Sequence, residues 1–302
     1  MRRRRLLSLA TTGALLSTNT ARATTPQPAQ ADGRFDLLAD WSFGRDRPDA
    51  TIHNMAELQN AFRFRYIYDA GQLDRLPTYW SSHRDYPQGD PRSLHVFSDN
   101  ALILKARMPQ GGGLRSGGLE SGMLRALLPV MPGMYVEMRA KLPRGLGVWP
   151  SFWLNPGVET PSGTFSATPW PPEIDIFEFF VWQGRTRPRI LQGEVHPAAN
   201  AGREGRTRDI FSLLSNGRYD PGIDFSADFH VFALDWVKDR PIWVVDGKPI
   251  KQTVIGWNAP PAHILITNQI GMTLKGVDLT GMTYGGDDWD YTLDYVRVWQ
   301  RA

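Results

Sequence analysis

Cysteine is absent from the 302-residue sequence. Disulfide bonds, thiolate metal sites and a cysteine nucleophile are therefore excluded. The sequence also lacks an apolar run that could span a membrane, since the run near the amino terminus covers about 11 residues where about 18 are needed. Helix-type periodicity is scarce, whereas glycine and proline are plentiful, with 29 and 23 residues. Frequent turn residues between short apolar segments are typical of β-rich proteins.

Residues 1–23 have the three parts of a secretory signal peptide. Four arginines follow Met1, residues 6–16 are mildly apolar, and the segment ends in the small-residue sequence Ala21-Arg22-Ala23. We predict a secreted or periplasmic protein, and the adjacent arginines are compatible with twin-arginine export. The alternative, a membrane anchor, is disfavoured by the short apolar run.

The positive charge of the sequence belongs to this leader. The whole chain has 34 basic and 31 acidic residues, which gives a formal charge of +3. Residues 1–23 contain five arginines and no acidic residue, so the remaining chain has 29 basic and 31 acidic residues and a charge of −2. A weakly acidic chain gives no reason to expect a nucleic-acid partner.

The rest of the chain has the pattern of one domain over residues 34–302, preceded by a flexible leader at 24–33 that is rich in Thr, Pro, Gln and Ala. Alternation of apolar and polar residues predicts strands at 136–142 and 231–236, and Asp246-Gly247 predicts a tight hairpin turn. Further strands are predicted at 95–97, 102–104, 262–270 and 291–299, and short helices at 54–62 and 209–215. This pattern predicts an all-β sandwich or barrel.

Three carboxylates stand close together in the segment Glu173-Ile174-Asp175-Ile176-Phe177-Glu178. On a regular strand Glu173 and Asp175 share a face, but Glu178 has the opposite parity. A one-residue bulge would bring all three acids to one face. Neighbouring carboxylates raise one another's pKa, which suits a pair of acids that shares a proton during catalysis. The alternatives are a calcium site and a solvated acidic edge strand, the latter disfavoured by the apolar flanks.

This segment matches the bulged E-x-D-x-x-E signature of glycoside hydrolase family 16, and its surroundings resemble the same family. Gly147–Leu154 is similar to the family's G-x-W-P-A-F-W-L strand, with Ser151 in place of alanine. Phe229–Lys248 resembles its F-H-x-Y-x-x-x-W and D-G strands, and Leu293–Trp299 resembles its closing strand. The resemblance covers roughly residues 35–301 and implies a jelly-roll β-sandwich with an open cleft on its concave face.

The resemblance also implies roles for the acids. Glu173 would be the nucleophile, Glu178 the general acid and base, and Asp175 a helper between them. Glu173 would attack the anomeric carbon while Glu178 protonates the leaving oxygen, and Glu178 would then activate water. Retention of the anomeric configuration requires the two working carboxyl groups to lie about 5–5.5 Å apart. No cofactor is needed for this chemistry.

Candidates for sugar binding are aromatic and polar, because sugars stack on indole rings and present hydroxyls at their edges. Trp149 and Trp153 are an even number of residues apart and share a face if their strand is regular, and Trp170 precedes the acids. The resemblance places His196 and Asn268 on the cleft. A structural role is the alternative for each of these residues.

The predicted function is retaining endo-hydrolysis of a β-linked polysaccharide, with β-1,3 or mixed β-1,3-1,4 glucan as the first expectation. Alternatives are depolymerisation of a bacterial exopolysaccharide or a sulfated galactan, and transglycosylation. A non-catalytic glucan-binding module is disfavoured, because all three acids are present. The resemblance further implies a structural calcium ion at Asp294, and we expect a monomer with a polysaccharide as its partner.

Overall fold

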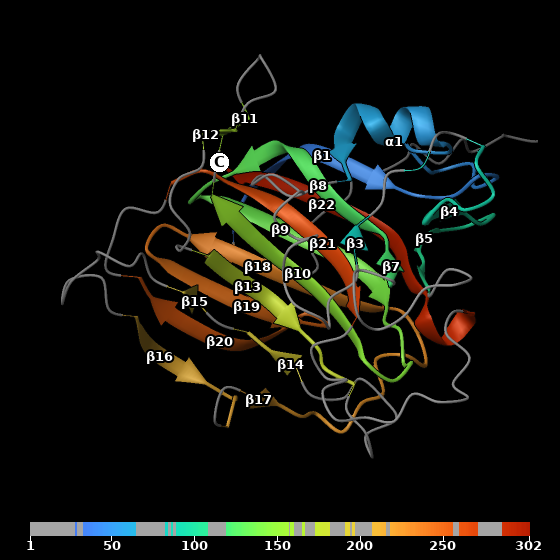
Figure 1. Ribbon diagram of the computed structural model, residues 1–302. Coiled ribbons are helices and arrows are strands. Elements are labelled where there is room, and N and C mark those ends of the chain that lie inside the picture. Colours follow the sequence, from blue (N-terminus) through green and yellow to red (C-terminus); the bar gives the residue numbers. More distant parts are fainter. Residues whose placement is uncertain are drawn as a thin grey trace, which may run out of the picture.

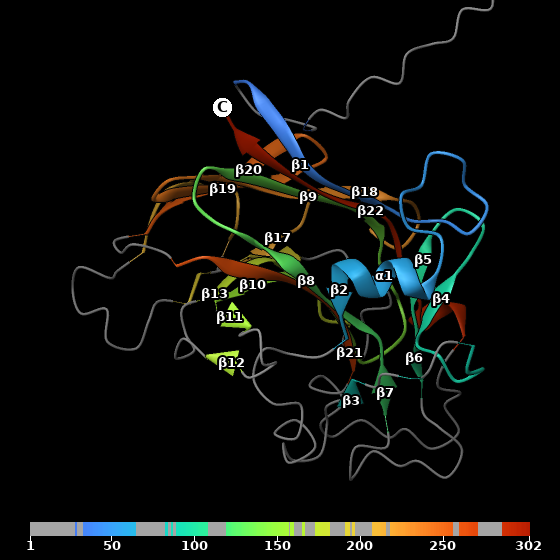
Figure 2. The ribbon, with the colours of Figure 1, turned by 90° about the horizontal axis from the view of Figure 1, so that it is seen from above.

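The computed structural model describes residues 28, 33–64, 82–83, 86, 89–107, 119–156, 158–159, 165–166, 173–181, 191–193, 195–196, 207–215, 218–255, 260–270 and 286–302. The predicted signal peptide, and all of the predicted leader except residues 28 and 33, lie outside this range. The described chain forms two large antiparallel sheets packed as two layers (Figures 1 and 2). This is the jelly-roll β-sandwich that the family resemblance implies, and it agrees with the all-β pattern of the sequence.

One layer is a nine-stranded sheet. Its strands, in spatial order, are β16 (Arg208–Ser212), β20 (Lys248–Val254), β19 (Arg240–Val245), β18 (His230–Val237), β9 (Met134–Lys141), β22 (Tyr291–Arg301), β5 (Leu102–Leu104) and β4 (His95–Phe97), and β1 (Phe35–Ser42) also pairs with β22.

The other layer is an eight-stranded sheet. Its strands are β17 (Arg218–Tyr219), β14 (Leu191–Gln192), β13 (Glu173–Glu178), β10 (Val148–Pro156), β21 (Ala262–Ile270), β8 (Met123–Val130) and β2 (Phe62–Arg63), and β15 (Val195–His196) also pairs with β13. Two small sheets lie beside it, formed by β11 (Val158–Glu159) with β12 (Phe165–Ser166), and by β3 (Ser82–His83), β7 (Glu120–Ser121) and β6 (Ala106–Arg107).

The core lies between the two large sheets, and the alternation of the sequence explains which side chains fill it. On β9 the inward residues are Val136, Met138 and Ala140, and all three are fully buried in the main core cluster. The predicted hairpin joins β19 to β20. Its turn residues Asp246 and Gly247 have φ values of 47° and 75°, which is the left-handed geometry of a tight hairpin turn.

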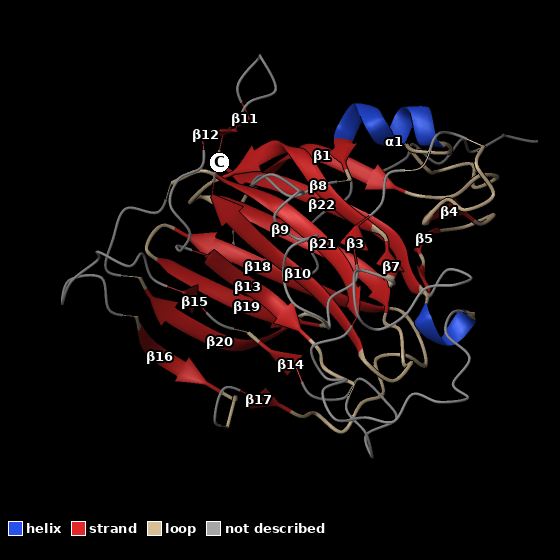
Figure 3. Ribbon diagram, in the orientation of Figure 1, coloured by secondary structure: helices blue, strands red, loops and turns tan. Residues whose placement is uncertain are grey.

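Helix is confined, within the described residues, to α1 (Met55–Ala61) and a short 3₁₀ turn, η3 (Asp287–Trp289), as Figure 3 shows. The Asn54 side chain caps α1 by accepting a hydrogen bond from the backbone N–H of Glu57, and Leu58 packs into the core. This confirms the helix predicted near residues 54–62. None of the described helices is long and apolar enough to cross a membrane.

The helix predicted at 209–215 is wrong, because Arg208–Ser212 form strand β16. The apolar residues Ile210, Phe211 and Leu213 imitate helical spacing, but all three are exposed at the edge of the nine-stranded sheet. Pairing with β20 sets their backbone conformation. Tertiary pairing therefore overrides the local pattern at this edge.

Candidate active site

Strand β13 carries the three acids, and its pairing with β10 contains the predicted bulge. Ser151 pairs with Glu178 and Phe152 with Phe177, but the next residue of β10, Trp153, pairs with Asp175. Ile176 is therefore the extra residue, and Ile176 and Phe177 both enter the core cluster. The bulge restores the parity of Glu178, so that the three acids lie on the face of the sheet turned away from the core. This face is called the acid face below.

The three acids differ in exposure. Asp175, in the middle, is 3% exposed, whereas Glu173 and Glu178 are half-buried. A half-buried carboxylate can reach a substrate while it is held by protein neighbours. The middle acid is enclosed by the protein, which suits a group that acts on its two neighbours.

The backbone at Asp175 is held from the opposite sheet. The indole Nε1 of Trp243, on β19, donates a hydrogen bond of 2.7 Å to the carbonyl oxygen of Asp175. Gly193 leaves room for this indole, because a Cβ atom there would lie 3.1 Å from Trp243 Cδ1. No local pattern predicts this bond, since its donor lies 68 residues beyond its acceptor.

Trp149 and Trp153 share the acid face, as the regular pairing of β10 with β21 requires. Trp149 donates a hydrogen bond of 2.9 Å from Nε1 to Oε1 of Glu178, and its ring stacks on Phe180. Trp153 is only 8% exposed and packs with Met123 and Leu265. Little of the Trp153 ring is therefore available to a sugar, whereas Trp149 lies against the acid itself.

Two further candidates are only partly placed. The backbone of His196, on β15, pairs with Glu173, which brings this residue next to the first acid in the sheet. The side chain of His196 lies outside the described part of the structure, and so does the whole of Trp170. Their predicted contacts with sugar stay predictions.

Comparisons with known proteins identify the family and the fold of this chain. Residues 84–271 match the sequence model of Glycosyl hydrolases family 16, which is more than half of the chain. The chain belongs to this family. The resemblance stated from the sequence motifs is thereby confirmed.

Two curated relatives are similar over about half of the chain. A glucan endo-1,3-β-glucosidase of Cryptopygus antarcticus is 38% identical over 181 residues, which is 54% of this chain and 60% of that protein. A β-glucanase of Rhodothermus marinus is 32% identical over 178 residues, which is 54% of this chain and 56% of that protein. The match thus spans little more than half the length of these relatives.

A solved structure supports the family fold over most of the chain. The catalytic domain of an endo-1,3-β-glucanase (laminarinase) from Thermotoga petrophila covers 89% of this chain and 99% of its own, with a TM-score of 0.60. Its sequence identity is 20%, so the likeness concerns the fold alone.

Asn268, which the family resemblance implies on the cleft, is fully buried instead. Its Nδ2 donates to the carbonyl oxygens of Leu104 at 2.8 Å and of Trp289 at 2.7 Å. Its neighbours Thr267 and Gln269 pair with Ser151 and Trp149, so these two residues share the acid face. The burial of Asn268 corrects the sugar-binding expectation. Its side chain lies inside the sandwich, where its bond to Leu104 links the two sheets.

Thr267 and Gln269 were missed because all nine residues of β21 are buried. A strand buried on both faces shows no alternation, so parity cannot be read from its sequence. The register of β21 with β10 shows instead which of its residues share the acid face.

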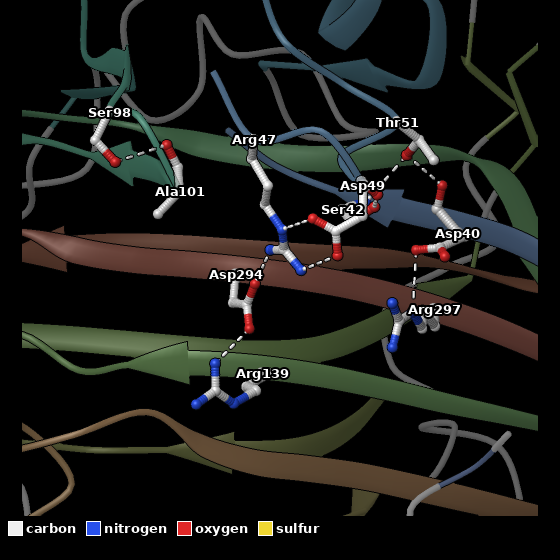
Figure 4. A network of polar contacts seen from close by, with 10 residues as sticks. All are labelled: Asp40, Ser42, Arg47, Asp49, Thr51, Ser98, Ala101, Arg139, Asp294 and Arg297. Carbon is white, nitrogen blue, oxygen red and sulfur yellow. Dashed lines mark hydrogen bonds and ion pairs between the residues drawn. The ribbon is translucent and has the colours of Figure 1, made fainter. Parts of the chain in front are cut away.

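Asp294 is the residue that the family resemblance implies as a calcium ligand. Its Oδ1 pairs with Arg47 and its Oδ2 with Arg139, while Arg47 is also held by both oxygens of Asp49 (Figure 4). Calcium takes six to eight oxygen ligands, and the described residues contain no group of three or more potential ligands that could hold a metal ion. Because two guanidinium groups take both carboxylate oxygens, the residues at Asp294 do not fit a calcium ion.

Proposed function

We propose that this chain is a retaining endo-β-glucanase that hydrolyses β-1,3 or mixed β-1,3-1,4 glucan. The observation that carries the proposal is the bulge at Ile176, which gathers three carboxylates on the acid face. Such a cluster is costly unless it is used, because neighbouring carboxylates repel. The curated relatives described above are named for action on β-glucan, which supports this substrate class.

In the proposed mechanism Glu173 is the nucleophile. Its carboxylate attacks the anomeric carbon, and the bond from this carbon to the leaving oxygen breaks as Glu178 gives that oxygen a proton. Glu178, now a carboxylate, then takes a proton from water, and the resulting attack releases the sugar with its configuration retained. Asp175 lies between them and orients the nucleophile.

The sequence of residues 1–23 supports export of the enzyme to its polymeric substrate. We propose that this segment is removed as a signal peptide after Ala23. Amino-terminal sequencing of the protein recovered from the periplasm or medium tests this, and an intact Met1 on the exported protein would contradict it.

The activity is tested with a reducing-sugar assay over laminarin, lichenan, agarose, carrageenan and xyloglucan. We expect hydrolysis of laminarin or lichenan by the wild-type enzyme, and none by Glu173→Gln or Glu178→Gln at unchanged melting temperature. Asp175→Asn should lose activity less completely. Near-normal turnover by either glutamine variant would refute the assigned roles, and activity on a galactan alone would refute the substrate class.

A further inference from the structure

The indole of Trp149 directly contacts the proposed acid–base residue. Its Nε1 donates a hydrogen bond of 2.9 Å to Oε1 of Glu178. Its ring stacks on Phe180, with the ring centroids 5.0 Å apart and an interplanar angle of 29°. The sequence predicted a sugar platform at Trp149, whereas these contacts engage the indole with protein groups.

The segments that carry these side chains are held together by their backbones. Pairing between them continues past Glu178, because Phe179 N–H donates to the Pro150 carbonyl at 3.1 Å and Val181 N–H donates to the Val148 carbonyl at 3.2 Å. The indole and the carboxyl group therefore extend from adjacent, hydrogen-bonded segments. The stack on Phe180 restricts the indole further, so the donor is fixed before a substrate binds.

We propose that Trp149 is a positioning residue for Glu178, and that its indole N–H assigns the catalytic proton to Oε2. The inference rests on the proposed function, in which Glu178 protonates the leaving oxygen. An indole N–H can only donate a hydrogen bond, so Oε1 is an acceptor in both protonation states of Glu178. In this proposal Oε2 carries the proton of the acid form and passes it to the glycosidic oxygen.

The same hydrogen bond assists the transfer of the proton. As the bond to the leaving oxygen breaks, the proton passes from Oε2 to that oxygen, Glu173 bonds to the anomeric carbon, and Glu178 becomes a carboxylate. Hydrogen bonds to an ionised acceptor are shorter and stronger than those to a neutral one. The bond from Trp149 thus strengthens as charge develops on Glu178, and it stabilises the transition state more than the ground state.

The decisive variant is Trp149→Phe, which keeps an aromatic ring against Phe180 and removes the N–H. On laminarin we expect kcat/KM to fall about 10- to 100-fold through kcat, with KM nearly unchanged. The alkaline limb of the kcat/KM profile should move to higher pH, because the carboxylate of Glu178 loses a donor. A 2,4-dinitrophenyl β-laminaribioside, whose leaving group needs no proton, should keep nearly the wild-type kcat/KM.

Trp299→Phe is the matched control. Trp299 is fully buried on β22, in the other sheet, so the same exchange there should leave both kcat/KM values and the pH profile unchanged.

A readout independent of activity is the indole ¹H–¹⁵N signal that disappears in Trp149→Phe. In the wild-type protein this signal should shift with pH in step with the alkaline limb, and Glu178→Gln should abolish that shift.

An equal loss of activity on laminarin and on the dinitrophenyl substrate, with an unmoved alkaline limb, would overturn the inference. A change in KM alone would return Trp149 to the role of a sugar platform. A wild-type protein inactive on both substrates would instead refute the proposed function, and the indole titration would then decide by itself whether Trp149 responds to Glu178.

Discussion

Asn268 offers a direct test of the difference between a cleft residue and a structural one. Leucine has the same number and branching of side-chain heavy atoms as asparagine, and it removes the amide. If Asn268 joins the two sheets, Asn268→Leu should lower the free energy of unfolding and leave KM for glucan unchanged. If Asn268 binds sugar, the opposite pattern is expected.

The size of the loss follows from the two hydrogen bonds. Asn268→Leu leaves the carbonyl oxygens of Leu104 and Trp289 without this donor in a buried setting, at about 1–3 kcal/mol each. Part of this is offset, because Oδ1 of Asn268 is buried with no hydrogen-bond partner among the described residues, and leucine removes it. We therefore expect a net loss of about 2–4 kcal/mol, which lowers Tm by about 4–16 °C in a domain of this size.

Gln269→Met is the matched control, one residue further along β21. Nε2 of Gln269 is buried and has no hydrogen-bond partner in the described part of the chain, so its removal should change the free energy of unfolding by less than about 1 kcal/mol. Calorimetry and laminarin kinetics on both variants decide the matter. A Tm of Asn268→Leu within 2 °C of the wild type, together with a raised KM, would refute the structural role.

Three other predictions follow from the structure. Chelation should leave Tm unchanged because Arg47 and Arg139 pair with Asp294, and a rise in Tm on adding calcium would contradict this. Burial lowers the pKa of His95 to about 4, so the unfolded chain takes up this proton first and the free energy of unfolding should fall from pH 6.5 to about pH 4. In urea unfolding across this pH range, the free energy of unfolding should fall less steeply for His95→Gln than for the wild type. An equal fall in both proteins would contradict the role of His95. Early products of laminarin should be mixed oligosaccharides with the β-anomer retained, and first appearance of the α-anomer by proton NMR would exclude Glu173 as nucleophile.

The sequence predicted the fold well where one face of a strand is buried and the other is not. Strand β9 alternates because its inward residues fill the core, and the hairpin turn at Asp246-Gly247 is encoded by the need for left-handed backbone. Strand β16 has neither signal, since all five of its residues are exposed and only its pairing with β20 makes it a strand. Such an edge cannot be recognised from local pattern.

The candidate site was predictable in part, for a similar reason. The three acids lie within six residues, and their parity mismatch alone requires the bulge. Asp294 pairs with Arg47, which is 247 residues away in the sequence. No local pattern therefore predicts that a guanidinium group binds this carboxylate. Short-range geometry is encoded in the motif, and long-range partners are not.

The bulge also links the nine-stranded sheet, which carries none of the three acids, to the position of these acids. An extra residue disturbs the hydrogen-bond ladder of its strand locally, and Ile176 is that residue in β13. The carbonyl of Asp175, next to it, accepts the indole N–H of Trp243 from the opposite sheet. Lys251 lies over the Trp243 ring, 4.9 Å from its centroid, and also donates to the carbonyl of Gly193. The position of the middle acid is thus fixed through the core of the sandwich, and a change on β19 or β20 can displace an acid that neither strand carries.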